Sequence, residues 1–150
     1  MAEMSPTEKP PVRLLLVDDE QGFANVLAKR IGKRNIQVRK AFSGFEVIQI
    51  LREEKFDVAV LDLKMEDMDG IEVLKIFRKM APNLQVIMLT GHGCEIAARE
   101  GLEYGAMDYL IKPCDFDVLI DKIQEVGRFH RRQDFGRKLT GEHPCFTNAQ

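Results

Sequence analysis

The sequence lacks several features that mark other classes of protein. It has only three cysteines, Cys94, Cys114 and Cys145, which are widely spaced and form no Cys-x-x-Cys pair. A zinc ribbon and a disulfide framework are therefore not expected. The sequence instead favours a reducing, cytoplasmic setting. No apolar run approaches the roughly 18 residues that a membrane helix needs, so no membrane association is expected.

Neither sign of charge dominates the chain. Its 150 residues include 22 Lys and Arg against 24 Asp and Glu, a net charge of -2, which argues against a generic polyanion binder. Residues 1–11 are acidic and rich in proline and lack the apolar stretch of a signal peptide. We interpret them as a disordered lead-in to a chain with room for one ordinary domain.

Short apolar runs alternate with helical patterns along residues 12–131. Runs without polar alternation are typical of strands buried on both faces of a parallel sheet, and they occupy Val12–Val17, Val58–Leu61, Val86–Leu89 and Met107–Ile111. The run Ile36–Val38 alternates with polar residues, which indicates a strand nearer the sheet edge.

Five helical patterns separate and follow these runs. Ser43 and Glu46 form a capping-box pattern at the start of the second helix, and Asp115 is placed to cap the last one. The fourth pattern, Cys94–Glu103, has only a thin apolar stripe whose largest residues are Ile96 and Leu102, so this helix is a candidate for motion.

The alternation of five strands and five helices predicts an α/β fold. We expect a flavodoxin-like, doubly wound (βα)₅ three-layer sandwich with a parallel five-stranded sheet in the order 2-1-3-4-5. The periodicity stops after about Arg132, so residues 132–150 are expected to form a flexible basic tail.

Polar side chains follow four of the predicted strands. The first strand ends at Asp18 and Asp19, the third at Asp62, the fourth at Thr90 and the fifth at Lys112. Ligands of such folds bind at the carboxyl ends of the strands, so these side chains should meet in one crevice. Three converging carboxylates repel one another unless a cation is present, and oxygen ligands suit Mg²⁺, which Mn²⁺ could replace.

We predict Asp19 and Asp62 as direct metal ligands, with Asp18 acting through a water molecule. The backbone carbonyl of Lys64 is the expected next ligand. An isolated Asp-Asp pair is more often a helix N-cap favoured by the helix dipole. The presence of Asp62 and Lys112 at neighbouring strand ends favours the metal site instead.

Asp62 is the candidate nucleophile, because a carboxylate can attack phosphorus from the rigid end of a strand. A metal ion and Lys112 would neutralise the charge of the phosphoryl group, and the Thr90 hydroxyl could donate a hydrogen bond to it. Simpler interpretations remain open, since Thr90-Gly91 also fits a plain turn and Lys112-Pro113 a surface lysine before a loop. The functional interpretation expects a cis bond before Pro113. Lys64 and His92 lie at the rim of the crevice, without a required role.

Four sequence motifs together resemble those of a known family. They are LLLVDDE (14–20), VAVLDLKMEDMDGIEVL (58–74), VIMLTGHG (86–93) and GAMDYLIKPCDFDVL (105–119). Over about 120 of its 150 residues the chain resembles the receiver domain of bacterial two-component response regulators. One departure is Glu66, which stands where the family usually has proline and bears on the stiffness of the loop after Asp62.

The resemblance implies specific roles for these positions: phospho-acceptor (Asp62), acidic metal pair (Asp18 and Asp19), switch hydroxyl (Thr90), the lysine of the family (Lys112) and aromatic switch (Tyr109). It implies that a sensor histidine kinase or histidine phosphotransfer protein supplies the phosphoryl group. Slow self-hydrolysis is expected in place of enzymatic turnover. The implied switch surface is the fourth helix–fifth strand–fifth helix face, through which a homodimer could also form.

The expected layout is a receiver at residues 12–131, resembling single-domain chemotaxis or phosphorelay regulators. The residues after Arg131 are too few for a DNA-binding module, so the output is expected to be an unknown downstream protein. A haloacid-dehalogenase-like phosphatase would need Asp-x-Asp after the first strand, and a flavodoxin would need a phosphate-binding loop there. A pseudo-receiver that serves only as an interaction module is disfavoured by the intact Asp62, Thr90 and Lys112.

Overall fold

The computed structural model describes residues 10–91 and 93–140, with the backbone alone for 131–140. Ten elements alternate along the chain: β1 (Val12–Val17), α1 (Gln21–Gly32), β2 (Ile36–Ala41), α2 (Gly44–Glu53), β3 (Val58–Asp62), α3 (Gly70–Met80), β4 (Gln85–Thr90), α4 (Glu95–Glu103), β5 (Asp108–Ile111) and α5 (Phe116–Thr140). His92 lies outside the described residues.

The strands form one parallel sheet in the order β2-β1-β3-β4-β5. The predicted fold class and strand order are therefore confirmed. β3 is buried along its whole length, whereas β2 lies at the sheet edge, as its sequence pattern indicated, and exposes Gln37, Arg39 and Lys40. The carboxyl ends of all five strands meet at one edge of the sheet, where the polar residues of the predicted site lie.

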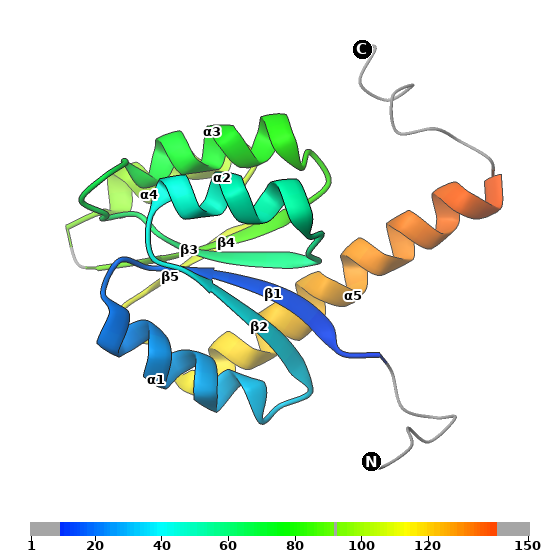
Figure 1. The fold of residues 1–150 in the computed structure, drawn as a ribbon, viewed down its shortest axis with the longest axis horizontal. Helices are drawn as coiled ribbons and strands as arrows, with labels where there is room; N and C mark the ends of the chain where they lie inside the picture. The colour runs from blue at the N-terminus through cyan, green and yellow to red at the C-terminus, as the bar shows by residue number, and fades with distance from the viewer. Residues whose placement is uncertain (1–9, 92, 141–150) are drawn as a thin grey trace.

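Helices cover both faces of the sheet, and the two layers of helices are separate in Figure 1. α1 and α5 pack on one face, through apolar residues such as Leu27, Ile31 and Ile123. α2, α3 and α4 pack on the other, where Val47 and Phe77 are fully buried. Each face has its own apolar core, because successive side chains of a strand point to opposite sides.

Side-chain caps fix where the helices begin. The Ser43 hydroxyl accepts the Glu46 N–H at 3.1 Å, as the capping-box pattern predicts, while the Glu46 carboxylate reaches one residue past the N-cap and accepts the Phe42 N–H at 3.4 Å. Asp115 Oδ1 accepts the Asp117 N–H at 2.8 Å and so caps α5 as expected. Satisfying these N–H groups stabilises each helix start by about 1 kcal/mol.

α4 is seated on small residues. Ala98 and Gly101 are its buried residues, and a Cβ at Gly101 would lie 2.2 Å from Met88 Sδ on β4. The sequence suggested Ile96 and Leu102 as its apolar anchors, which is wrong, because Ile96 is 85% exposed and Leu102 39% exposed. The helix therefore buries little apolar surface, as its thin apolar stripe indicated.

The last helix corrects the expected end of regular structure. α5 continues from Phe116 to Thr140, so residues 132–140 are helical where a loosely ordered tail was expected. The remainder of that tail lies outside the described residues. Among residues 10–91 and 93–140, no helix combines the length and the apolar character needed to cross a bilayer.

Candidate functional site

The predicted site residues lie at adjacent strand ends. Asp62 is the last residue of β3 and pairs in register with Leu89, the residue before Thr90 at the end of β4. The Lys112 N–H, one residue beyond β5, donates to the Thr90 carbonyl at 2.6 Å. Asp18 follows β1 directly and is buried. The sheet therefore gathers residues from four strands, because parallel strands end at the same edge.

Three carboxylates cluster at this edge. Asp18, Asp19 and Asp62 each offer an oxygen within 4.8 Å of the other two. Lys112 Nζ lies 3.4 Å from Asp18 Oδ2 and 3.8 Å from Asp62 Oδ2. The structure therefore brings together the three acids and the lysine that the sequence singled out.

The electrostatics of the cluster disfavour a charged Asp62. Burial raises the pKa of Asp62 from 3.8 to about 6, opposed by the hydrogen bond from the Lys64 N–H and by the Lys112 ammonium. The Asp18 and Asp19 carboxylates contribute to this rise, because each disfavours a negative charge on Asp62. One ammonium does not balance three carboxylates, so a cation bound here would relieve repulsion that the protein alone leaves in place.

Backbone N–H groups orient each carboxylate. Asp18 Oδ1 accepts the Glu20 N–H at 2.9 Å, and Asp62 Oδ1 accepts the Lys64 N–H at 3.2 Å. Asp19 Oδ2 accepts the Glu66 N–H at 2.8 Å. Each acid thus keeps a second oxygen for other partners, and a set of oxygen donors fits Mg²⁺. The division into direct and water-mediated ligands, and the Lys64 carbonyl as ligand, stay predictions.

Lys112 has a second contact that the sequence did not reveal. Its ammonium lies 4.6 Å from the centroid of the Phe23 ring, at the start of α1. A ring under an ammonium adds about 0.5–1 kcal/mol of attraction and limits where the amine can go. The Lys112–Pro113 bond is cis, as the functional interpretation expected. The only sequence signal for this contact was the position of Phe23, just after the acidic turn at residues 18–20.

Thr90 and Tyr109 occupy the face of the sheet that carries α4. Thr90 is fully buried, and its hydroxyl is 3.4 Å from the Gly91 carbonyl, a weak hydrogen bond. Tyr109 pairs in register with Met88 and packs against the same apolar core. Side chains two residues apart share a face, so Thr90 and Tyr109 lie on the same side. Their role as a switch pair stays a prediction.

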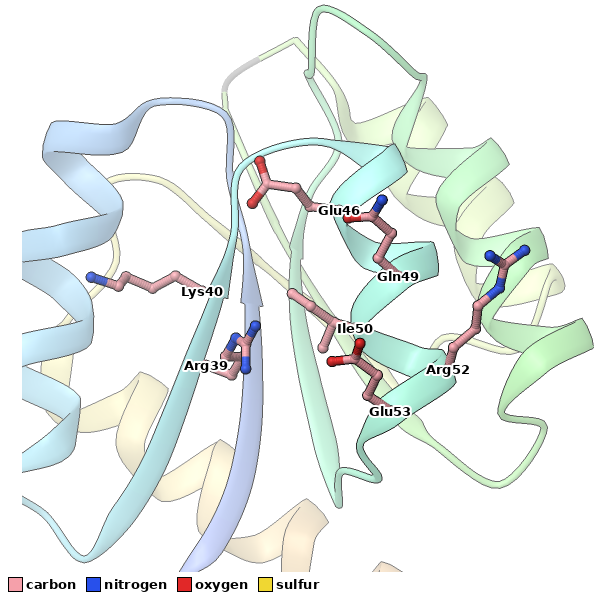
Figure 2. Close-up of a pocket in the computed structure, with 7 residues that line it drawn as sticks. All are labelled: Arg39, Lys40, Glu46, Gln49, Ile50, Arg52 and Glu53. Carbon is pink, nitrogen blue, oxygen red and sulfur yellow. The ribbon is translucent and has the colours of Figure 1, made fainter.

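A cleft of about 470 Å³ lies elsewhere, between the edge strand β2 and α2 (Figure 2). Lys40 points toward α1, where its ammonium donates to Asn25 Oδ1 at 2.8 Å, while Arg52 points away from the strand. Arg39 pairs with Glu54. The residues that line this cleft thus carry charges of both signs, unlike the three carboxylates that converge at the strand ends.

Comparisons with known proteins agree with this geometry. The family model described as response regulator receiver domain matches residues 14–124. Sporulation initiation phosphotransferase F of Bacillus subtilis is 33% identical over 113 residues, which are 75% of this chain and 91% of the relative. Transcriptional regulatory protein GlrR of Escherichia coli is 36% identical over 115 residues, 77% of this chain and 26% of the relative. This chain therefore spans about a quarter of the length of that regulator.

Solved structures give the same result for the fold. The Francisella response regulator 1452 receiver domain matches with a TM-score of 0.72 and 32% identity, covering 78% of this chain and 97% of that one. A CheY-like receiver domain from Methanospirillum hungatei matches with a TM-score of 0.77 and 28% identity, covering 82% and 98%. The similarity thus extends over nearly the whole of each receiver domain.

Proposed function

This chain belongs to the response regulator receiver family, and on that premise we propose that Asp62 accepts a phosphoryl group. The observation that supports the proposal is the geometry around its carboxylate. Asp62 ends a buried strand, shares a cluster with two other acids, and has the Lys112 ammonium 3.8 Å from its Oδ2. No comparable feature supports a phosphatase of the haloacid dehalogenase type or a pseudo-receiver among the described residues.

The chemistry follows from these side chains. An oxygen of the ionised Asp62 carboxylate attacks the phosphorus of a phosphohistidine, the P–N bond breaks, and an acyl phosphate forms as the imidazole leaves. Lys112 pairs with one phosphoryl oxygen, and the Thr90 hydroxyl turns to donate to another. Mg²⁺, for which Mn²⁺ could substitute, would be held by Asp18, Asp19, Asp62 and the Lys64 carbonyl, and would neutralise charge on the transferred group.

Receiver domains take their phosphoryl group from a histidine kinase or a histidine phosphotransfer protein, and we propose such a donor here. The Bacillus subtilis relative is named a phosphotransferase, which favours a phosphorelay. The domain would be self-phosphorylating and slowly self-hydrolysing, without turnover of a free substrate.

The output surface is proposed to be the face formed by α4, β5 and α5. It exposes apolar side chains, among them Leu102, Met107 and Phe129, at 39%, 41% and 43% exposure. A cleft of about 400 Å³ between β5 and α5 is lined by Met107 and Phe129 together with Asp108 and Lys122. A downstream protein or a second copy of the chain would bind there.

The deciding experiment is incubation with acetyl phosphate and Mg²⁺, followed by intact mass and peptide mapping. We expect one phosphoryl adduct, on the peptide that contains Asp62, and none in Asp62→Asn. Asp57→Asn is the matched control, because Asp57 directly precedes β3 and lies at the opposite end of that strand from Asp62. An adduct on Asp18 or Asp19 would contradict the proposal, and steady turnover of a small phosphoester would favour the phosphatase.

A further inference from the structure

The loop between β3 and α3, residues 63–69, is hydrogen-bonded on two sides. On one side the Glu66 N–H donates to Asp19 Oδ2 at 2.8 Å. On the other, the Gly44 N–H at the start of α2 donates to both oxygens of Asp67, at 3.1 and 3.0 Å. The first of these bonds exists because residue 66 is not proline, which has no N–H.

The Asp67 contact fixes the loop against α2. Gly44 is the first residue of that helix, so its N–H has no partner within the helix, and a carboxylate there is favoured by the helix dipole. Met68 packs against the same residue, since a Cβ at Gly44 would lie 2.7 Å from Met68 Sδ and 2.9 Å from its Cβ. Neighbouring residues of the loop thus make both a polar and a close packing contact with the helix start.

The loop is also closed at its own ends. The Gly70 N–H donates to the Leu63 carbonyl at 3.1 Å, and a Cβ at Gly70 would lie 2.6 Å from Leu63 Cα. With its ends fixed and Asp67 bonded to α2, the backbone of Glu66 has a defined position. Its N–H therefore meets Asp19 in a set direction.

Asp19 needs such a partner more than the other two acids do. Lys112 contacts Asp18 and Asp62, whose carboxylates are also nearly buried, while Asp19 is only half-buried in the turn after β1. A carboxylate that is free to rotate loses that freedom when it binds a metal, and this loss weakens binding. Partners that orient a ligand typically change metal affinity 10–100-fold when they are removed.

We propose that the Glu66 N–H is a positioning group for Asp19 as a metal ligand, and that Asp67 maintains it by holding the loop to α2. This inference rests on the proposed function, because it takes the acidic cluster to be a cation site. It assigns Glu66 and Asp67 a part in cation binding through the backbone of one and the side chain of the other, without contact between either and the cation.

The test is calorimetric titration of the full chain with Mg²⁺, without a phosphoryl donor. Glu66→Ala keeps the N–H and removes the carboxylate, whereas Glu66→Pro removes both. We expect Glu66→Pro to bind Mg²⁺ about tenfold more weakly than Glu66→Ala. Equal affinities of these two variants would overturn the inference.

A second pair of variants keeps the test valid if proline disturbs folding. Asp67→Asn retains an oxygen that can accept the Gly44 N–H, whereas Asp67→Ala does not. We expect Asp67→Asn to bind Mg²⁺ within about twofold of the natural chain and Asp67→Ala at least threefold more weakly. Equal affinity of Asp67→Asn and Asp67→Ala would again overturn the inference.

Two further outcomes separate this inference from the proposed function. A merely structural role would lower the urea midpoint of the metal-free variants and leave the Mg²⁺ affinity of the folded protein unchanged, which would overturn positioning. If the natural chain itself binds no Mg²⁺, the cation site of the proposed function fails, and this inference fails with it. If the natural chain binds Mg²⁺ and all four variants match it, only the positioning role is wrong.

Discussion

Replacing Asp62 with asparagine should make the metal-free protein more stable at neutral pH. The asparagine side chain has nearly the same shape as the carboxylate and can still accept the Lys64 N–H, so packing is preserved. What the substitution removes is an ionised group that is 9% exposed and faces Asp18 and Asp19. Most substitutions at buried positions destabilise a protein. A stabilising one is expected here because the function requires like charges to lie close together, and the substitution removes one of them.

The magnitude follows from the pKa of Asp62. Burial and the neighbouring acids raise that pKa from 3.8 to about 6, after the opposing effects of the Lys64 N–H and Lys112. At roughly 1.4 kcal/mol per pH unit, ionised Asp62 lowers the free energy of unfolding by about 3 kcal/mol at pH 7. Asparagine avoids this loss, so Asp62→Asn should gain up to about 3 kcal/mol.

The sign fixes the pH window. A carboxyl whose pKa is raised by folding contributes its stability fully below the unfolded pKa, and loses it as the pH rises through the folded pKa. The natural protein should therefore lose stability relative to Asp62→Asn between about pH 4 and pH 6, which are the two pKa values of the group. Above pH 6 the difference should be constant, and below pH 4 it should nearly vanish.

The assay is urea unfolding of both proteins from pH 4 to pH 8 with excess chelator. Asp57→Asn is the control, since Asp57 is also buried but accepts the Arg13 N–H at 2.9 Å and contacts His130 Nδ1 at 3.2 Å. Removing that paired charge should not stabilise the chain. If Asp62→Asn is no more stable than the natural protein at pH 7.5, or if the difference does not change with pH, this account of the site is refuted.

Four other expectations test the site. Excess chelator should abolish labelling by acetyl phosphate, and Asp19→Asn should weaken Mg²⁺ binding more than tenfold in calorimetry; labelling that survives chelation would contradict the metal site. Lys112→Ala should raise the pKa of Asp62 above about 6, because the Lys112 ammonium lowers that pKa. The midpoint of the pH profile of labelling should therefore shift to higher pH. Thr90→Ala should still be labelled but lose most of the change in amide exchange across residues 90–112, and changes confined beyond Arg131 would place the switch elsewhere.

The fold could be predicted from the sequence because the pattern of apolar residues along a strand reflects how that strand is buried. The continuously apolar run at Val58–Leu61 became β3, buried on both faces, and the alternating run after Asn35 became the edge strand β2. The end of α5 could not be predicted in this way. Among the residues whose side chains the structure describes, Val126 is the last apolar residue of α5 in the core and Phe129 is 43% exposed, so the pattern that marks a buried face fades although the backbone stays helical to Thr140.

The acidic cluster could be predicted because its members come at the ends of strands. Once the strand order was inferred, Asp18, Asp62 and Lys112 had to meet at one edge of the sheet. The contacts that orient them could not be predicted. Phe23 under the Lys112 ammonium and the N–H of Glu66 on Asp19 depend on the path of a helix and a loop. A backbone N–H has no side-chain signature, so only the absence of proline at position 66 indicated it.

The packing of α4 on β4 explains why this helix is the expected mobile element. α4 packs on β4 through Gly101 against Met88, two residues before Thr90, and its larger apolar residues face outward. A shift of this helix therefore exposes little buried apolar surface, and its free-energy change is small. Thr90 and Tyr109 lie on the same face of the sheet as Met88. If the Thr90 hydroxyl moves toward a phosphoryl group, as the proposed function expects, the helix next to it is therefore one whose displacement costs little free energy. Under the proposed function, the site and its response would thus be linked through the paired strands β3 and β4, with Asp62 at the end of β3 and α4 packed on β4.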